Sequence, residues 1–211
     1  ILASAGSLRN EVYRFNKEGG RSTTPLFTLE EPILDMAVDA VGQLWVMTGK
    51  DLLLVDIESG TVLRRMSGPG VDPLTHALAI QSTTGDIFVS SGNGIEIFHP
   101  NETDPTKQWK HFSNERVGDL AFGPDGRLWA VRWTGSTIAS AAPGSTSDIV
   151  SFPMSGKTMG RAELEYRLDG VIDSITFGVE GGPLAGLLLA SSNGSQRPVV
   201  DDAATPAPHK S

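Results

Sequence analysis

One short segment recurs three times along the chain. It is written VDAVGQLWVMTG, then IQSTTGDIFVSSG, then FGPDGRLWAVRWTG. The aromatic residue at its centre is Trp45, Phe88 or Trp129, so the copies lie 43 and 41 residues apart, and a glycine-containing turn precedes each aromatic. Self-similarity with a period of about 40 residues is typical of stacked four-stranded blades. The repeat therefore predicts an all-β chain that forms a β-propeller or part of one.

Each copy belongs to a unit of four short β-rich runs separated by turn residues, which is the pattern of consecutive antiparallel hairpins. Three complete units are legible. The predicted strands are 34–39, 44–48, 52–57 and 61–66 in the first unit, 77–81, 86–90, 94–99 and 108–112 in the second, and 118–122, 127–132, 148–152 and 163–168 in the third.

Incomplete units stand at both ends. Residues 1–5, 11–15 and 25–29 align with second, third and outer strands, because Gly6 follows Leu2 at the spacing that separates Gly49 from Trp45. Residues 172–178 and 187–191 supply only an inner and a second strand. Two closures stay open. In one, the last inner strand completes the opening blade, which gives four blades with 187–191 as a surplus strand. In the other, which we favour, the natural chain carries further blades on both sides.

Residues 1–192 are therefore predicted to form propeller blades that are incomplete at both ends. Residues 193–211 are rich in Pro, Ala and polar residues, which bury too little apolar surface to order a core, so they are predicted to be a loop or tail. The chain opens on ILASAG, without Met or a signal-peptide pattern. We expect it to be a piece of a longer polypeptide.

Composition excludes several classes of function. A formal net charge of −8 and a pI near 4.9 argue against nucleic acid as a partner, since binding phosphates needs clustered Lys and Arg. The longest apolar runs, such as 52–55 and 187–190, are far shorter than the roughly 20 residues of a membrane-spanning helix, so this segment is not expected to insert into a membrane. Cysteine is absent, which excludes disulfides and thiolate metal sites. This usage fits a bacterial protein, and we expect an extracellular or periplasmic one.

The segment LAFGPDGRLWAV, with its weaker copies MAVDAVGQLWVM, LAIQSTTGDIFV and ITFGVEGGPLAGLLLA, resembles the inner hairpin of the NHL, gluconolactonase and streptogramin lyase group of propellers. Two-component sensor propellers share a similar pattern. The resemblance covers the hairpins of about four blades and implies the fold rather than an activity, because these residues make turns and pack between blades. WD40 propellers are disfavoured, since no blade ends in Trp-Asp.

Candidate ligand residues lie where the inner strands begin, at the mouth of the central channel, because propeller ligands usually bind there. Asp35 and Asp119 occupy the same position of two units, and His76 and Asp173 stand one residue earlier in the other two. In the resembled lyases and lactonases this is roughly the region of the metal and catalytic groups, and such side chains suit a divalent ion. The favoured interpretation is structural: these carboxylates cap turns and tie neighbouring blades together.

Insertions into the repeat are further candidates, because they tend to gather on one functional face. They are residues 101–107, 135–147 and 178–186, and Trp133 at the start of one is a candidate contact residue, with core packing as its favoured role. The acidic strings 101–106 and 199–206 place oxygen donors close together, which calcium prefers. Neither matches a known calcium loop, so solvated loops are favoured and no cofactor is predicted.

No nucleophile elbow, catalytic triad or phosphate loop is legible, so no catalytic residue is assigned. The sequence favours a non-catalytic module that binds a protein or carbohydrate ligand and adjoins further blades of the same polypeptide. The alternatives are a metal-dependent lactonase or lyase of the resembled type and a periplasmic sensor propeller.

Overall fold

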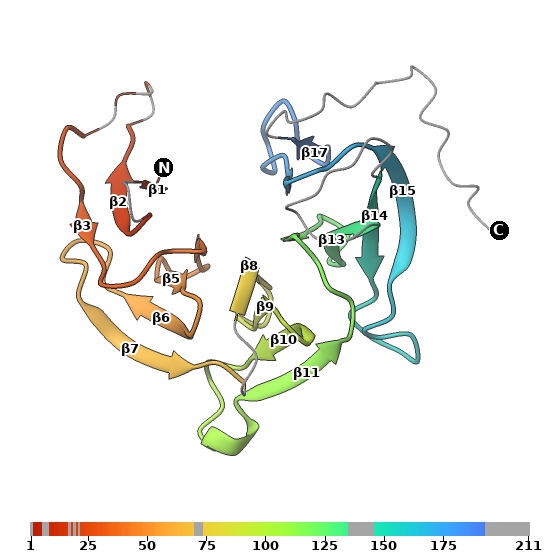
Figure 1. The fold of residues 1–211 in the computed structure, drawn as a ribbon, viewed down its shortest axis with the longest axis horizontal. Helices are drawn as coiled ribbons and strands as arrows, with labels where there is room; N and C mark the ends of the chain where they lie inside the picture. Colours follow the sequence, from red (N-terminus) through yellow and green to blue (C-terminus); the bar gives the residue numbers. More distant parts are fainter. Residues whose placement is uncertain are drawn as a thin grey trace.

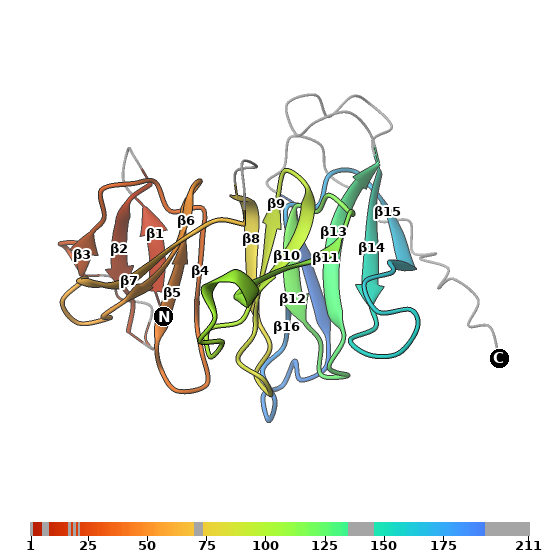
Figure 2. The same cartoon turned by 90° about the horizontal axis from the view of Figure 1, so that it is seen from below.

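The computed structural model describes residues 2–5, 9–16, 18, 20, 22–69, 74–134 and 146–192. Within them the fold is all-β apart from a short 3-10 turn, Pro105–Lys107, and the strands form five antiparallel sheets. Figure 1 shows the sheets side by side in an arc that stays open between the first sheet and the last. Figure 2 shows the innermost strands standing next to one another along the inside of the arc.

The three middle sheets have four strands each, as the repeat predicts. Their strand order follows the chain from the inside of the arc to the outside. The strands are β4 (Asp35–Val38), β5 (Leu44–Met47), β6 (Asp51–Val55) and β7 (Val62–Ser67), then β8 (Leu74–Ile80), β9 (Ile87–Ser91), β10 (Gly94–Phe98) and β11 (Trp109–Ser113), then β12 (Asp119–Phe122), β13 (Leu128–Thr134), β14 (Thr146–Phe152) and β15 (Glu163–Asp169).

The two end sheets are incomplete within the described residues, and they lack the strands that the sequence predicts to be missing. The first contains β1 (Leu2–Ala5), β2 (Glu11–Arg14) and β3 (Phe27–Thr28), which take the second, third and outer positions. The last contains β16 (Ser174–Phe177) and β17 (Leu188–Ser191), the inner and second positions. Strand limits differ slightly from expectation: β3 is shorter than 25–29, and β8 begins before residue 77, with a register shift between Leu74 and Leu78.

Glycine sets the turn before each second strand of the three complete blades. Gly42, Gly85 and Gly126 have φ angles of 86°, 77° and 75°, a left-handed conformation that other residues seldom adopt. This requirement explains why a glycine precedes Trp45, Phe88 and Trp129 at nearly constant spacing. The repeat in the sequence is therefore a repeat of turn geometry.

The core lies between neighbouring blades, where a large side chain of one blade covers an aromatic residue of the blade before it. Phe98, the last residue of β10, packs against Trp45 of β5 with ring centroids 6.1 Å apart. Phe152, the last residue of β14, packs against Phe112 of β11 at 5.7 Å, and Phe112 in turn contacts Phe88 of β9. Each interface thus uses the third strand of the following blade to bury the preceding one.

The packing between blades that the resemblance implies for the hairpin residues is confirmed for Leu44, Trp45, Phe88 and Leu128, all of which are buried. The prediction is wrong for Trp129, which is only partly buried. The reason is the incomplete last sheet. Phe177 of β16 packs edge-on against the Trp129 ring at 5.5 Å, but no described third strand follows β17 to cover the indole as Phe98 covers Trp45.

Candidate channel-mouth site

Asp35 begins the inner strand β4 and ties it to the next blade. Its Oδ2 accepts a hydrogen bond of 2.7 Å from the backbone N–H of Leu78 in β8, and its Oδ1 accepts one of 2.7 Å from the N–H of Met36. Leu78 is buried, so its N–H depends on this carboxylate for a partner. The side chain that the sequence offers as a ligand candidate therefore joins two inner strands.

Asp119 repeats this geometry two blades further on. Its Oδ2 accepts a hydrogen bond of 2.7 Å from the backbone N–H of Ile175 in β16, and its Oδ1 accepts one of 2.9 Å from the N–H of Leu120. We call the Asp35–Leu78 and Asp119–Ile175 bonds the forward clamps. They are the bonds expected of the structural alternative, in which these carboxylates tie neighbouring blades.

Burial dominates the electrostatics of both clamp carboxylates. It raises the pKa of Asp35 to about 6, against the opposing effect of the hydrogen bonds from Leu78 and Met36, and the charge of Asp119 raises it slightly further. Burial also raises the pKa of Asp119, against the hydrogen bonds from Ile175, Ser174 and Leu120. For both carboxylates burial outweighs the hydrogen bonds that favour the charged form.

The other two units use different residues at this position. In the second blade Ala77 replaces the aspartate, and its N–H donates to the hydroxyl of Ser90 in β9 at 2.9 Å. The last sheet has Ser174 here, preceded by the partly buried Asp173, whose backbone N–H donates to the carbonyl of Ser191 at 2.8 Å. The position that begins the inner strand is therefore Asp in two units, Ala in one and Ser in one.

Two candidates cannot be placed in full. His76 lies in β8 and Trp133 in β13, but their side chains, like the insertion 135–145 and the acidic string 199–206, lie outside the described residues. Among the residues that the structure does describe, no group of three His, Asp or Glu side chains is placed to hold a metal ion. Within the described residues Asp35 and Asp119 therefore stand as clamp carboxylates without a third donor beside them.

The acidic string 101–106 forms a loop whose carboxylates bind within the loop. Asp104 Oδ1 accepts from the N–H of Thr106 at 3.0 Å and from its hydroxyl at 2.7 Å, and Lys107 pairs with Oδ2 at 3.1 Å. Glu102 Oε1 accepts from the N–H of Asp104 at 2.9 Å. These bonds close a turn before the 3-10 segment. The insertion 178–186 is likewise a series of turns, with one isolated bridge between Gly178 and Ala185.

Sequence reasoning missed a cluster of ion pairs in the third blade. Asp148 at the start of the β14 core is buried, and its carboxylate pairs with Arg167 at 2.7 Å and with Arg132 at 3.0 Å. Arg132 also pairs with Glu115 at 3.1 Å. The hydrogen bond from Arg167 holds the pKa of Asp148 below its usual value.

Buried carboxylates of the third strand recur in the other complete blades. Asp51 of β6 pairs with Arg65 of β7 at 2.5 Å, and Glu96 of β10 pairs with His111 of β11 at 2.9 Å. The bond to Glu96 raises the pKa of His111. The signal that could have found these pairs is positional, since Asp51 and Asp148 both follow the second strand of their blade at the start of the third.

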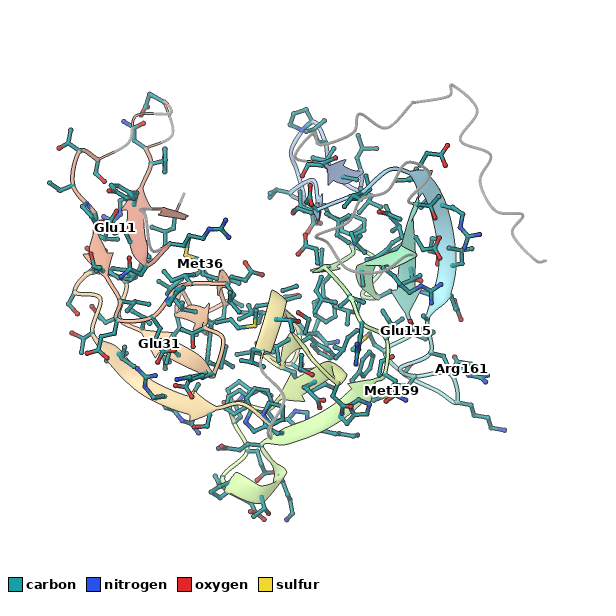
Figure 3. The ribbon with its side chains drawn as sticks, in the orientation of Figure 1. Glu11, Glu31, Met36, Glu115, Met159 and Arg161 are labelled. Carbon is teal, nitrogen blue, oxygen red and sulfur yellow. The ribbon has the colours of Figure 1, made fainter. Side chains whose placement is uncertain are left out.

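Two grooves flank the described blades near polar residues. One, of about 580 Å³, lies between the first sheet and β4 and includes Asp35, Met36 and Phe15 in its lining. Figure 3 shows Met36 on the inner side of the arc, facing the first sheet. The other, of about 710 Å³, lies between β11 and the β14–β15 connection, where Figure 3 shows Glu115 and Arg161. Its lining is mainly polar and includes His111, Asn114, Thr158 and Glu163.

Comparison with known proteins places the chain by fold alone. No protein-family model and no curated protein sequence matches it. A solved structure of a protein of unknown function from Bacteroides caccae matches 94% of this chain and 70% of its own at 14% identity and a TM-score of 0.52. A chain of the mitotic checkpoint complex matches 86% of this chain and 51% of its own at 17% identity and a TM-score of 0.52. Virginiamycin B lyase from Staphylococcus aureus matches 86% of this chain at 16% identity, with a TM-score of 0.46.

The blade topology and these likenesses define the class of protein as a β-propeller, as the sequence predicts. The two structures with a TM-score of 0.52, at 14% and 17% identity, support the fold alone. The chain spans 56% of the length of the virginiamycin B lyase and 51% of the checkpoint chain. In the part of the chain that the structure describes, no helix has the length and apolar character needed to cross a membrane.

Proposed function

We propose that this chain is a non-catalytic propeller module that binds a protein or carbohydrate ligand within a larger bacterial extracellular or periplasmic protein. The observation that carries the proposal is the pair of forward clamps. Asp35 and Asp119 are the carboxylates best positioned to serve as ligands at the channel mouth, and both already accept backbone hydrogen bonds from the following inner strand. A carboxylate used in this way contributes to blade assembly, which supports a scaffold at this position rather than a catalytic centre.

The polar groove between β11 and the β14–β15 connection supports the binding role. Its volume of about 710 Å³ falls in the range of ligand sites in proteins. Asn114, Thr158 and Arg161 supply hydrogen-bond donors and acceptors along it. Polar groups of this kind suit the hydroxyls of a carbohydrate or the backbone and side chains of a protein.

A second candidate function, a metal-dependent lactonase or lyase, is favoured by one observation. Burial raises the pKa of Asp35 to about 6, and strongly shifted carboxyl groups concentrate at catalytic sites. In that case His76 or Asp173 would complete a set of metal ligands with one of the clamp aspartates. A catalytic metal site also keeps an open coordination position and supported ligands.

Calorimetric titration of chelator-treated protein with zinc, manganese and calcium separates the two candidates. The module predicts no stoichiometric site of micromolar or tighter affinity. A site of that affinity that is lost in both Asp119→Ala and His76→Ala, and kept in Glu180→Ala, would move the enzyme to first place. Glu180 is the matched control because it is an exposed carboxylate in the 178–186 turns, away from the inner-strand starts.

A further inference from the structure

The polar groove between β11 and the β14–β15 connection, residues 153–162, lies between the second and third complete blades. Both of these sheets have the four strands of a complete blade, so the groove does not depend on the incomplete sheets at the ends of the chain. Figure 3 shows Arg161, one of its lining residues, at the outer side of the arc. The charges along the groove indicate what kind of ligand it suits.

The acidic side chains that line the groove already have cationic partners outside it. Glu115 pairs with Arg132 at 3.1 Å, and Glu163 pairs with Arg127. These pairs join the groove to the body of the third blade, because Arg127 precedes β13 and Arg132 lies within it. The two glutamates are therefore neutralised without a ligand.

His111 is a cation that is matched in the same way. Its Nδ1 lies 2.9 Å from the carboxylate of the buried Glu96, and its Nε2 lies 3.0 Å from Oδ1 of Asn114. Both partners are hydrogen-bond acceptors, so both ring nitrogens donate and the ring is positively charged. This charge offsets that of Glu96 and leaves the amide Nδ2 of Asn114 to face the groove.

Arg161 is the cation of the groove that has no such match. In the part of the chain that the structure describes, no carboxylate pairs with its exposed guanidinium. Its backbone is nevertheless held in place, because its N–H donates to the carbonyl of Thr158 at 2.9 Å and closes a turn. Gly160 in this turn has a φ of 76°, and a Cβ there would lie 2.3 Å from the carbonyl oxygen of Phe112 in β11. The turn therefore packs directly against β11 and presents an unneutralised arginine beside the groove.

Given the binding role proposed above, we propose that the polar groove binds a carbohydrate that carries a carboxylate, such as an oligomer of uronic acids. Arg161 pairs with the carboxylate, and Asn114 and Thr158 bond to hydroxyls of the sugar. A guanidinium suits this role because it can donate two parallel N–H bonds to one carboxylate.

An acidic peptide fits the groove less well. Extended peptides bind along an open strand edge, where the backbone supplies the hydrogen bonds. The edge of β11 is not open along its length, because Gly160 packs on Phe112 and the pairing of β11 with β10 is interrupted by a register shift at the same place. The groove instead offers the side-chain hydroxyl, amide and guanidinium groups of Thr158, Asn114 and Arg161.

The test is calorimetric titration of this chain with short oligomers of glucuronic, galacturonic and mannuronic acid, with the methyl esters of the same oligomers, and with a glutamate-rich peptide. At least one acid oligomer should bind, and its methyl ester should bind about tenfold more weakly, because the ester cannot form the charged pair. Arg161→Gln should weaken binding of the acid oligomer by a similar factor. The matched control is Lys157→Gln, which removes the same charge from an exposed residue of the same connection that does not line the groove, and it should leave the affinity unchanged. Urea unfolding of both variants should match the wild type, since both side chains are exposed.

Three results would overturn the proposal: no binding of any acid oligomer, equal affinity for acid and ester, or equal weakening by Arg161→Gln and Lys157→Gln. Binding of the peptide alone would overturn the acidic carbohydrate and leave the binding module standing. Absence of binding by the acids, the esters and the peptide would count against the proposed module as well.

Discussion

The side-chain Oδ2 of Asp35 accepts a 2.7 Å hydrogen bond from the backbone N–H of Leu78, a residue 43 positions later in the chain. The same bond joins Asp119 to Ile175, 56 positions later. In both cases the acceptor begins an inner strand and the donor lies in the inner strand of the blade that follows. This relationship ties the inner strands β4 and β12 to the inner strands that follow them.

Hydrogen exchange should detect the two forward clamps separately. Asp35→Ala removes the acceptor of the Leu78 N–H, and an unpaired buried N–H costs about 1–3 kcal/mol, so local opening should become roughly ten to a hundred times more frequent. We expect faster exchange at Leu78 with little change at Ile175, and the reverse in Asp119→Ala. Equal acceleration at both amides in either variant would mean that the bonds do not act locally.

The pH dependence of stability should reveal the buried carboxyl of Asp35. Its pKa is about 6 in the folded chain and 3.8 as the ordinary value, so between these pH values the folded state binds more protons than the unfolded state. The free energy of unfolding should therefore fall as the pH rises from 4 to 7, by about 2 kcal/mol from this group. Urea unfolding of the wild type and of Asp35→Asn at both pH values isolates the effect, because the Asn variant keeps every other titrating group. Parallel changes in the two proteins would exclude it.

Two equivalent tryptophans should differ in their contribution to stability. Trp45 is buried beneath Phe98, so Trp45→Ala should lower the free energy of unfolding by about 3–5 kcal/mol. Trp129 is only partly buried, so Trp129→Ala should cost less, about 1–3 kcal/mol. Urea denaturation of both variants provides the comparison. A larger loss of unfolding free energy for Trp129→Ala than for Trp45→Ala would show that the indole of Trp129 is covered in solution.

Removing the arginine partners of Asp148 in the third blade should destabilise the fold. Replacing both Arg132 and Arg167 with Met leaves the carboxylate of Asp148 buried without its cations, which should lower the free energy of unfolding. Adding Asp148→Asn removes the charge and should recover part of that loss. Chemical denaturation of the double and triple variants measures it, and a triple variant less stable than the double one would contradict the prediction.

The fold was predictable because its determinants are local and repeated. Turn glycines such as Gly42 and Gly126, followed by Leu44-Trp45 and Leu128-Trp129, recur with the period of a blade, and the structure places them at equivalent points. The incomplete end sheets could be predicted for the same reason. The turn residues and apolar residues around each strand identify its position within a unit.

The repeat pattern predicted less of the candidate site than of the fold. The sequence identified Asp35 and Asp119 as equivalent, but their partners are backbone groups in the next blade, and a backbone N–H leaves no pattern in a sequence. The partial burial of Trp129 was missed because it depends on which strands the last sheet contains rather than on Trp129 itself. Arg132 and Arg167 were missed because they lie on different strands and meet only across Asp148.

The forward direction of the clamps also sets an order for folding during synthesis. At about 5–20 residues per second, Leu78 leaves the ribosome roughly 2–9 s after Asp35, and Ile175 follows Asp119 by a slightly longer interval. During that interval the clamp aspartate has been synthesised, but the residue whose backbone N–H donates to it has not. The first and third complete blades are thus each tied to the blade translated after them, and a pause in translation between two such blades would leave the clamp aspartate of the earlier one without its donor.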